Sequence, residues 1–198
     1  MTKFNILGVY HLATAGDRAS GSAWYNAAFR VCDMIGANYG VDVNTVAGVV
    51  AALSPRNRWS RNIADAENMV KLYVAGGADA AAGCKVCTFA SGKKKALQIL
   101  AENITNPDEI RAILNGPKLV EFFTCIADDR PDVCIDGHAY SIWVGERITL
   151  ADVPPISKKL RETIKADYMA AADILGVSPS TLQAITWVTW RRLHGLSD

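Results

Sequence analysis

The hydrophobic residues of this chain recur mainly at spacings of three and four, and alternating hydrophobic and polar runs are few. That spacing places apolar side chains on one face of an α-helix, so the pattern predicts a chain made mostly of helices. Segment 43–53 is the clearest case, with valines and leucine on one face, Asp42 or Asn44 as the N-cap and Pro55 as the stop. We expect a short buried helix there.

The same spacing predicts eight further helices. Their expected ranges are 17–38, 60–74, 93–102, 107–115, 118–127, 137–145, 156–175 and 179–193. Asn106-Pro107 and Ser178-Pro179 each combine a capping side chain with a proline at the first helical position. The glycine- and alanine-rich run 75–83 has no large side chain to bury and is expected to be a loop with at most one helical turn. The sequence therefore predicts an all-α fold.

Composition favours one folded domain. The chain has 198 residues, 50% of them hydrophobic, which is enough for a substantial core, and no long linker or internal repeat is present. We therefore expect residues 1–198 to form a single helical domain. Lysine and arginine total 21 against 20 for aspartate and glutamate, so no overall charge draws the protein to nucleic acid. Any nucleic-acid site must be a local patch.

The sequence lacks the marks of membrane, secreted and zinc-binding proteins. No stretch approaches the roughly 20 apolar residues of a membrane span, and the first residues lack a signal-peptide plan. Five scattered cysteines are typical of buried thiols in a reducing compartment. Cys84 and Cys87 have zinc-ribbon spacing, yet no second ligand pair accompanies them. We expect a cytoplasmic protein that binds no membrane and has no disulfide, metal or cofactor.

The segment most indicative of chemistry is Val-Cys-Ile-Asp136-Gly-His138. An aspartate between an apolar triplet and a predicted helix lies at the helix N-terminus, where backbone amides stabilise its anion. Alone, Asp136 is a capping residue without chemistry. Two features upstream add to it: a turn at Asn115-Gly116-Pro117 opens a helix whose free amides could hold a phosphate, and Lys118 lies 18 residues before Asp136.

This order of turn, lysine, helix, apolar triplet and aspartate resembles the helix-hairpin-helix DNA glycosylase superfamily, which contains endonuclease III and the adenine mismatch glycosylase. Segments 50–62, with its Leu-Ser-Pro-Arg-Asn, and 89–100 resemble other parts of the same core and follow the same order. The resemblance thus spans roughly residues 43–145. It implies a fold of about nine to ten helices around a cleft, with 43–145 as its core and two lobes as one way of packing.

The chain departs from the superfamily pattern at two places. The hairpin Leu-Asn-Gly116-Pro-Lys lacks the second glycine of the usual motif, and no cysteine follows Cys134, so the iron-sulfur loop of endonuclease III is absent. The Leu-Ser-Pro-Arg-Asn and Gly-Pro-Lys features also resemble a divergent branch found among phage proteins. That branch includes the alpha-glutamyl/putrescinyl thymine pyrophosphorylases, which would place the chain in the host-cell cytoplasm if it is phage-encoded.

The resemblance implies that Asp136 is catalytic. Releasing a base from deoxyribose passes through an oxocarbenium-like transition state, which a carboxylate beneath the sugar stabilises. In members that also cut the strand, a lysine at the position of Lys118 occurs. A deprotonated Lys118 would attack the sugar carbon and form a Schiff base, and the alternative for this residue is a solvated lysine or a phosphate contact.

Residues around the segment 54–62 are expected to contact nucleic acid. Arg56, Arg58 and Arg61 form a plausible phosphate patch, although they could instead pair locally with Asp65 or Glu67. A base in a duplex must be flipped out before an enzyme can act on it, and Trp59 and His138 are candidates to stack around it. Core packing for Trp59 and a local hydrogen bond for His138 are the alternatives. The full expected set is Ser54, Arg56, Asn57, Arg58, Trp59, Arg61, Asn62, Gly116 and His138.

Three functions remain open from the sequence. The first is N-glycosylase-type chemistry on a flipped base, with DNA as the partner. The second is a base-modifying transferase or pyrophosphorylase in thymine hypermodification, with a nucleotide or modified base as the partner. The third is a non-catalytic nucleic-acid or nucleotide binder. The sequence does not name the base or the oligomeric state.

Overall fold

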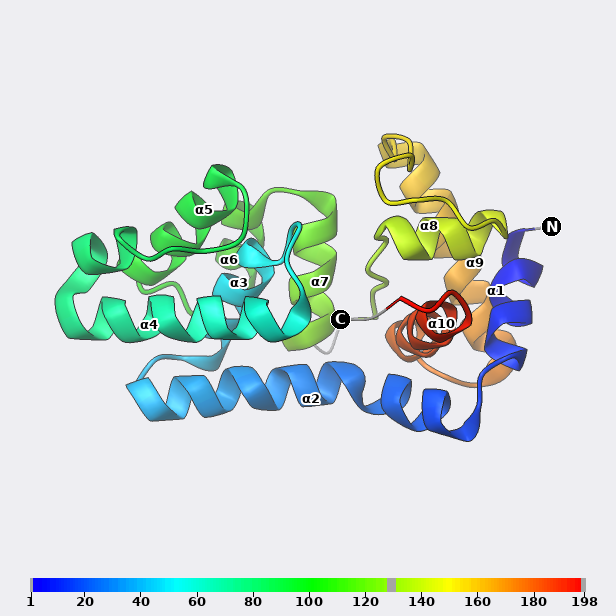
Figure 1. Cartoon of the computed structure of the whole chain (residues 1–198), viewed down its shortest axis with the longest axis horizontal. Coiled ribbons are helices and arrows are strands. Elements are labelled where there is room, and N and C mark those ends of the chain that lie inside the picture. The colour runs from blue at the N-terminus through cyan, green and yellow to red at the C-terminus, as the bar shows by residue number, and fades with distance from the viewer. Residues whose placement is uncertain (1, 128–130, 197–198) are drawn as a thin grey trace. The chain divides into compact units, whose positions relative to one another are not determined.

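The computed structural model describes residues 2–127 and 131–196, and within them the fold is all-α, as predicted (Figure 1). Residues 128–130, which belong to the segment of resemblance, lie outside the described part. The described residues contain ten helices and no strand. In chain order these are α1 (Thr2–His11), α2 (Ala15–Tyr39), α3 (Val43–Leu53), α4 (Trp59–Ala82), α5 (Ala90–Ala101), α6 (Pro107–Leu114), α7 (Pro117–Ala127), α8 (Gly137–Val144), α9 (Lys158–Leu175) and α10 (Pro179–Leu193).

The chain divides into two compact units. The terminal unit is built from both ends of the chain, with described residues 2–25 and 131–196, and the central unit from residues 26–127. Helix α2 begins in the first and continues in the second. The terminal unit therefore holds α1, the first part of α2, and α8 to α10, and the central unit holds the rest of α2 and α3 to α7.

Eight of the ten helices match predicted ranges to within a few residues, and α4 begins as predicted but ends at Ala82, eight residues past the predicted end and within the run that was expected to be a loop. Asp42 caps α3, its carboxylate accepting a hydrogen bond from the Asn44 backbone N–H at 2.8 Å. The helical torsions of α4 are interrupted at Gly76 and Gly77, where the sequence predicted a stop, and one further helical turn follows. Helix α1 was not predicted, because its apolar residues do not gather on one face and so leave no periodic pattern.

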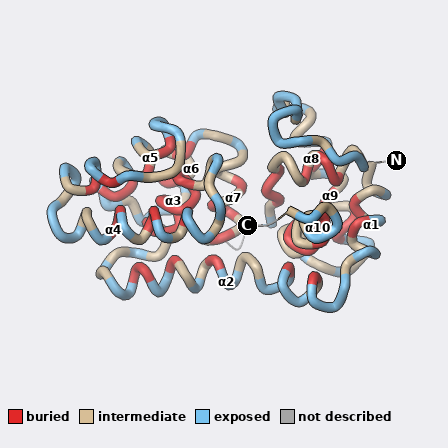
Figure 2. The backbone as a smooth tube through the Cα atoms, in the orientation of Figure 1, coloured by how far each residue is buried: buried red, intermediate tan, exposed pale blue. Residues whose placement is uncertain are grey.

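Helix α3 is the core of the central unit. All residues from Thr45 to Leu53 are buried, and α4, α5, α6 and α7 pack around them (Figure 2). Gly92 on α5 shows how close this packing is, since a Cβ placed there would lie 2.5 Å from the Ala52 carbonyl oxygen. A helix surrounded on all sides is expected to be apolar all round, as α3 is.

The core of the terminal unit joins α1, α8, α9 and α10 around fully buried residues such as Tyr168, Ile164 and Ile142. The first part of α2 lies against α10, where a Cβ on Gly21 would be 2.4 Å from the Ile185 Cα. Only glycine allows that approach. The terminal unit is thus assembled from segments at opposite ends of the chain.

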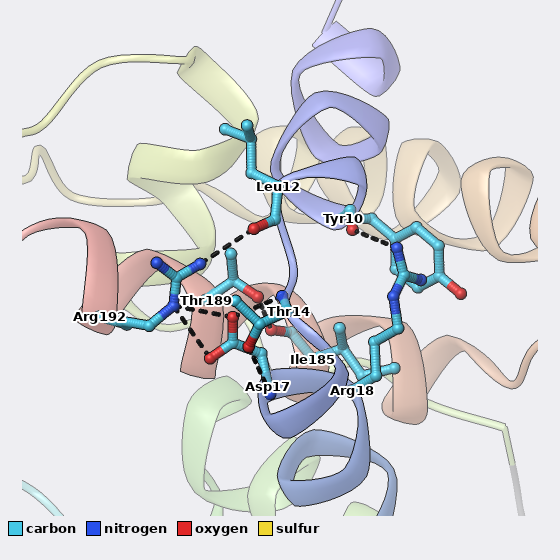
Figure 3. A network of polar contacts seen from close by, with 8 residues as sticks. All are labelled: Tyr10, Leu12, Thr14, Asp17, Arg18, Ile185, Thr189 and Arg192. Atoms are coloured by element: carbon cyan, nitrogen blue, oxygen red, sulfur yellow. Dashed lines mark hydrogen bonds and ion pairs between the residues drawn. The ribbon is translucent and has the colours of Figure 1, made fainter.

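A polar network ties the two ends of the terminal unit together (Figure 3). The buried carboxylate of Asp17 accepts hydrogen bonds from the Arg192 Nε at 2.8 Å and from the Thr14 backbone N–H at 2.8 Å. Arg192 also donates to the Leu12 carbonyl at 2.9 Å. Burial raises the pKa of Asp17, but the hydrogen bonds from Thr14 and Arg192 outweigh it, so the net pKa is lowered.

None of the helices in the described residues combines the length and the apolar character needed to cross a lipid bilayer.

Candidate functional site around Asp136

Asp136 is the N-cap of α8, as its place in the sequence predicted. Its backbone is extended (φ −98°, ψ −174°), and Oδ1 accepts a hydrogen bond from the Ala139 N–H at 2.8 Å. The side chain is half-buried, and the three residues before it, Val133, Cys134 and Ile135, are buried. Within residues 2–127 and 131–196, Asp136 Oδ2 has no hydrogen-bond partner. One carboxylate oxygen is thus fixed and the other is available to a ligand.

The buried segment before Asp136 has no sheet partner, so its polar groups need other partners. Helix α9 supplies two of them. Arg161 Nη1 donates to the Ile135 carbonyl oxygen at 2.9 Å, and Lys165 Nζ forms an ion pair with Asp132 Oδ1 at 2.5 Å. Asp132 Oδ1 also accepts from the Val133 N–H at 2.7 Å. The backbone that leads to Asp136 is therefore held by side chains from α9.

His138, two residues beyond Asp136, lies beside a group of aromatic side chains. Its ring lies edge-on to Trp187 at 6.3 Å between centroids, and Trp187 lies 6.0 Å from Trp24. Trp24 contacts Tyr25 at 4.9 Å, and the Arg191 guanidinium lies over the Trp187 ring at 4.3 Å. We call His138, Trp187, Trp24 and Tyr25 the aromatic cluster. All four are partly exposed, so the cluster is both rigid and accessible.

Two buried polar residues lie behind this surface. Gln183 accepts a hydrogen bond from the Tyr25 hydroxyl at 2.7 Å through Oε1, which orients the tyrosine ring. Tyr168 is fully buried, and its hydroxyl has no hydrogen-bond partner of normal geometry within the described residues. Burial raises the pKa of the Tyr168 phenol, the nearby Thr186 side chain lowers it, and the negative charge of Asp136 raises it, so that the net pKa is raised. Tyr168 therefore remains neutral near Asp136.

The turn predicted at Asn115-Gly116-Pro117 lies in the central unit, where the two residues Asn115 and Gly116 join α6 to α7. Asn115 adopts the left-handed conformation (φ 38°, ψ 37°), and its N–H donates to the Arg111 carbonyl. Asparagine tolerates this conformation better than most residues. Lys95 Nζ donates a hydrogen bond to the carbonyl oxygen of Leu114, the last residue of α6, and so caps the end of that helix. Gly116 follows, and α7 begins at Pro117, one residue before the predicted start.

Lys118 is the second residue of α7 and is half-buried. Its place in the first turn is the one predicted from the sequence. The catalytic role implied by the resemblance stays a prediction.

Residues 54–62, which we call the basic connection, run from the end of α3 into the first turn of α4. Their polar groups help to hold this segment in its conformation. Ser54 Oγ donates to the Ala51 carbonyl at 2.9 Å. Asn57 Nδ2 donates to Asp65 Oδ2 at 3.1 Å, and the same oxygen accepts from the Cys87 N–H at 2.8 Å. Asp65 is 8% exposed. It therefore acts as the hub that joins the basic connection to the loop before α5.

The three arginines of the basic connection have different surroundings. Arg56 adopts φ 57°, uncommon outside glycine, and its guanidinium lies over the Phe89 ring at 4.9 Å. Arg61 Nε lies 3.8 Å from Asp65 Oδ1, which is the local pairing considered from the sequence. Arg58 is the N-cap of α4, is exposed and has no side-chain capping bond.

Two other residues of the expected set pack inside the central unit. Asn62 is 2% exposed, and its Nδ2 donates to the Val50 carbonyl at 3.0 Å. Trp59 is half-buried, with its ring 6.4 Å from and nearly perpendicular to Phe122. The side chain of Asn62 thus lies in the core and holds α4 to α3, and Trp59 has a packing partner.

The expected site residues fall into two groups. Asp136 and His138 lie together in the terminal unit, and Lys118, Gly116 and the basic connection lie in the central unit. None of Trp24, Trp187, Gln183 and Tyr168 was among the site residues expected from the sequence. Gln183 and Trp187 are four residues apart on one face of a predicted helix, and this was the pattern that could have identified them.

The cysteines and acidic residues offer no metal centre. In the part of the chain that the structure describes, no three His, Cys, Asp or Glu side chains are grouped to hold an ion. Cys84 is buried, and Cys87 is half-buried, and both are free thiols. Burial raises the pKa of the Cys32 thiol to about 12, which makes it unreactive.

Comparison with known proteins gives a family but no described relative. No curated protein and no solved structure matches the chain significantly. Residues 1–194 match the family DUF7178, described as a family of unknown function. Since the match covers nearly the whole chain, the protein belongs to the DUF7178 family.

Proposed function

We propose that the protein is an enzyme that acts on a nucleobase of DNA by N-glycosylase-type chemistry, with Asp136 as the catalytic carboxylate. The observation that carries the proposal is how the two oxygens of that carboxylate are hydrogen-bonded. One oxygen is fixed by the Ala139 N–H at the N-terminus of α8, and the other has no partner among the described residues. A fixed anion of this kind is preorganised to stabilise positive charge on a sugar.

The chemistry needs a carboxylate but no cofactor. As the bond between the sugar C1′ and the base nitrogen breaks, the base leaves with the electron pair and C1′ gains oxocarbenium character. Asp136 stabilises that charge, water adds to C1′, and its proton passes to the carboxylate or to the leaving base. The products are a free base and an abasic sugar.

The aromatic cluster supports the proposal because it suits a planar substrate. Trp187 and Trp24 are partly exposed, and His138 is two residues from Asp136. Stacking on such rings is a sequence-tolerant way to hold a flipped base. The cluster lies in the same unit as Asp136 and connects to it through α8, so the stacking surface and the carboxylate share one rigid framework.

Groups in the central unit support the proposal that the partner is a DNA backbone. A two-residue turn joins α6 to α7, and its position before Asp136 agrees with the order found in the helix-hairpin-helix glycosylases. Arg58 is exposed at the N-terminus of α4, where backbone amides favour an anion. These groups would bind phosphates, and so would Lys118 at the start of α7.

The test is incubation with oligonucleotides carrying a panel of normal and modified bases, with and without borohydride, read by mass spectrometry. We expect wild type to release one class of base and Asp136→Asn to release none. Asp173→Asn, an exposed aspartate on α9, is the matched control and should retain activity. Equal release by wild type and Asp136→Asn would overturn the proposal.

The same assay separates the alternatives. A mass change of the base without its release would indicate a base-modifying transferase. Tight binding that Asp136→Asn leaves unchanged, with no product, would indicate a non-catalytic binder. A borohydride-trapped adduct that is lost in Lys118→Ala would establish strand-cleaving chemistry in addition to base release.

A further inference from the structure

Helix α9 places two positive charges one helical turn apart. Arg161 and Lys165 are at positions i and i+4, so they project from the same face of the helix. Two like charges at this spacing destabilise an isolated helix. Both side chains are partly buried rather than extended into solvent. Contacts outside the helix must therefore account for their arrangement.

Those contacts converge on the segment that ends at Asp136. Arg161 donates to the carbonyl of Ile135, the residue immediately before the N-cap, at 2.9 Å. Lys165 pairs with Asp132 at the start of the same segment, with side-chain exposures of 23% and 17%. The two contacts thus grip both ends of residues 132–135. Fixing the Ile135 carbonyl fixes the peptide plane that joins Ile135 to Asp136.

We infer that Arg161 and Lys165 are positioning residues that hold the backbone of residues 132–135 so that the Asp136 carboxylate stays at the N-terminus of α8. The catalytic consequence rests on the proposed function, whereas the structural consequence does not. Neither residue touches the expected reacting atoms. Their effect passes through the Ile135–Asp136 peptide to the hydrogen bond between Asp136 Oδ1 and the Ala139 N–H.

The Ala139 amide provides a readout that needs no substrate. It is in the first turn of α8, where backbone amides have no intrahelical acceptor, so Asp136 is its partner. Its hydrogen-exchange rate, measured by NMR, therefore reports how well the carboxylate is held. Amides in the middle of α10 serve as a reference for opening of the whole unit.

We expect Arg161→Met to speed exchange at Ala139 about tenfold or more, because a hydrogen bond from a charged donor is lost. Exchange in the middle of α10 should change much less. Lys165→Met should show a smaller selective increase, since it acts at the far end of the segment. Lys159→Met is the matched control, an exposed lysine on the same helix, and should leave Ala139 unchanged.

Chemical rescue sharpens the test. Millimolar guanidinium should restore slow exchange at Ala139 in Arg161→Gly, because the ion can occupy the place of the missing group. If Arg161→Met does not fold, Arg161→Lys retains the charge with a poorer geometry and should show an intermediate exchange rate. Unchanged exchange at Ala139, or a rise shared equally by all amides of the unit, would overturn the inference.

The activity arm separates this inference from the proposed function. If wild type releases a base, Arg161→Met should lower kcat by tenfold or more with KM nearly unchanged, because substrate contacts remain. A kcat equal to that of wild type would count against positioning. If wild type releases no base from any substrate, the proposed function fails, and the exchange measurements still decide whether Arg161 and Lys165 position Asp136.

Discussion

The segment around Asp136 and the basic connection were both expected to be functional from their polar residues, yet they are built differently. Asp136 itself bonds locally to the Ala139 N–H, but the segment before it is held by distant groups, with Arg161 contacting the preceding carbonyl, and Asp136 Oδ2 is left without a hydrogen-bond partner within the described residues. In the basic connection, Ser54 and Asn57 use their side chains on nearby backbone and on Asp65. Polar residues in a turn are often needed to form the turn itself.

The largest effect that would test this comparison is on activity at Asp136. We expect Asp136→Asn to lower base release by about 100- to 1000-fold, the range seen when one preorganised electrostatic group is removed. Its thermal stability should change little, since asparagine is also a good N-cap. Steady-state kinetics and thermal unfolding measure the two quantities. A large loss of thermal stability in Asp136→Asn would mean that Asp136 serves the fold, as the structural residues of the basic connection do.

The next effect is on stability at Asp65. Asp65→Ala removes the acceptor of the half-buried Cys87 N–H and leaves Asn57 Nδ2 with only its bond to the Leu53 carbonyl. We expect a loss of about 3 kcal/mol in the free energy of unfolding, as when charged hydrogen-bonded groups are lost from a buried site. Denaturant unfolding measures it, with Asp79→Ala on the exposed side of α4 as the control. A loss as small as that of the control would mean that the basic connection does not depend on this hub.

A smaller effect is expected on stability at low pH, and this effect should distinguish the terminal unit from the central unit. The folded-state pKa of Asp17 lies below the ordinary aspartate value of 3.8, so this group contributes stability that is present above its unfolded pKa. That stability is lost as the pH falls through the folded pKa. Amide exchange between pH 5 and 2 should show the terminal unit weakening with falling pH, and Asp17→Asn should flatten this dependence. An unaltered pH dependence in Asp17→Asn would refute the role of the pair with Arg192.

The smallest effect is expected at Arg58, an exposed arginine of the basic connection. Arg58→Ala should change the free energy of unfolding by less than about 0.5 kcal/mol, the usual limit for surface substitutions. If Arg58 contacts a phosphate, the slope of log affinity for DNA against log salt should fall by about 0.9. Fluorescence anisotropy across salt concentrations measures this slope. A slope equal to that of wild type would remove Arg58 from the expected contacts.

Local sequence predicted most of the helices because helix formation depends on near neighbours. Caps such as Asp42 and Ser178, stops such as Pro55 and apolar spacing lie within a few residues of what they control. The same reasoning placed Asp136 as a cap. It missed α1, whose burial depends on α8, α9 and α10 more than one hundred residues away. Such packing leaves no mark in the periodicity of the short segment itself.

The candidate site was only partly predictable for the same reason. The sequence pointed to Asp136 and His138, but the aromatic partners Trp24 and Trp187 come from α2 and α10. It also placed Asn62 among nucleic-acid contacts, whereas the residue is inside the central unit. A polar side chain in an amphipathic helix does not reveal whether a backbone carbonyl, here that of Val50, awaits it on another helix.

By itself, then, the sequence determined the all-α class, the positions of most helices and the capping place of Asp136, all of which depend on interactions between residues a few positions apart. Only the tertiary structure decided which polar residues serve the fold and which remain available. It showed that α9 supplies Arg161 and Lys165 to the segment before Asp136, and that polar side chains of the basic connection bond to nearby backbone and to Asp65. The physical reason is that buried hydrogen bonds must be satisfied, and their partners are chosen by the packing of distant segments.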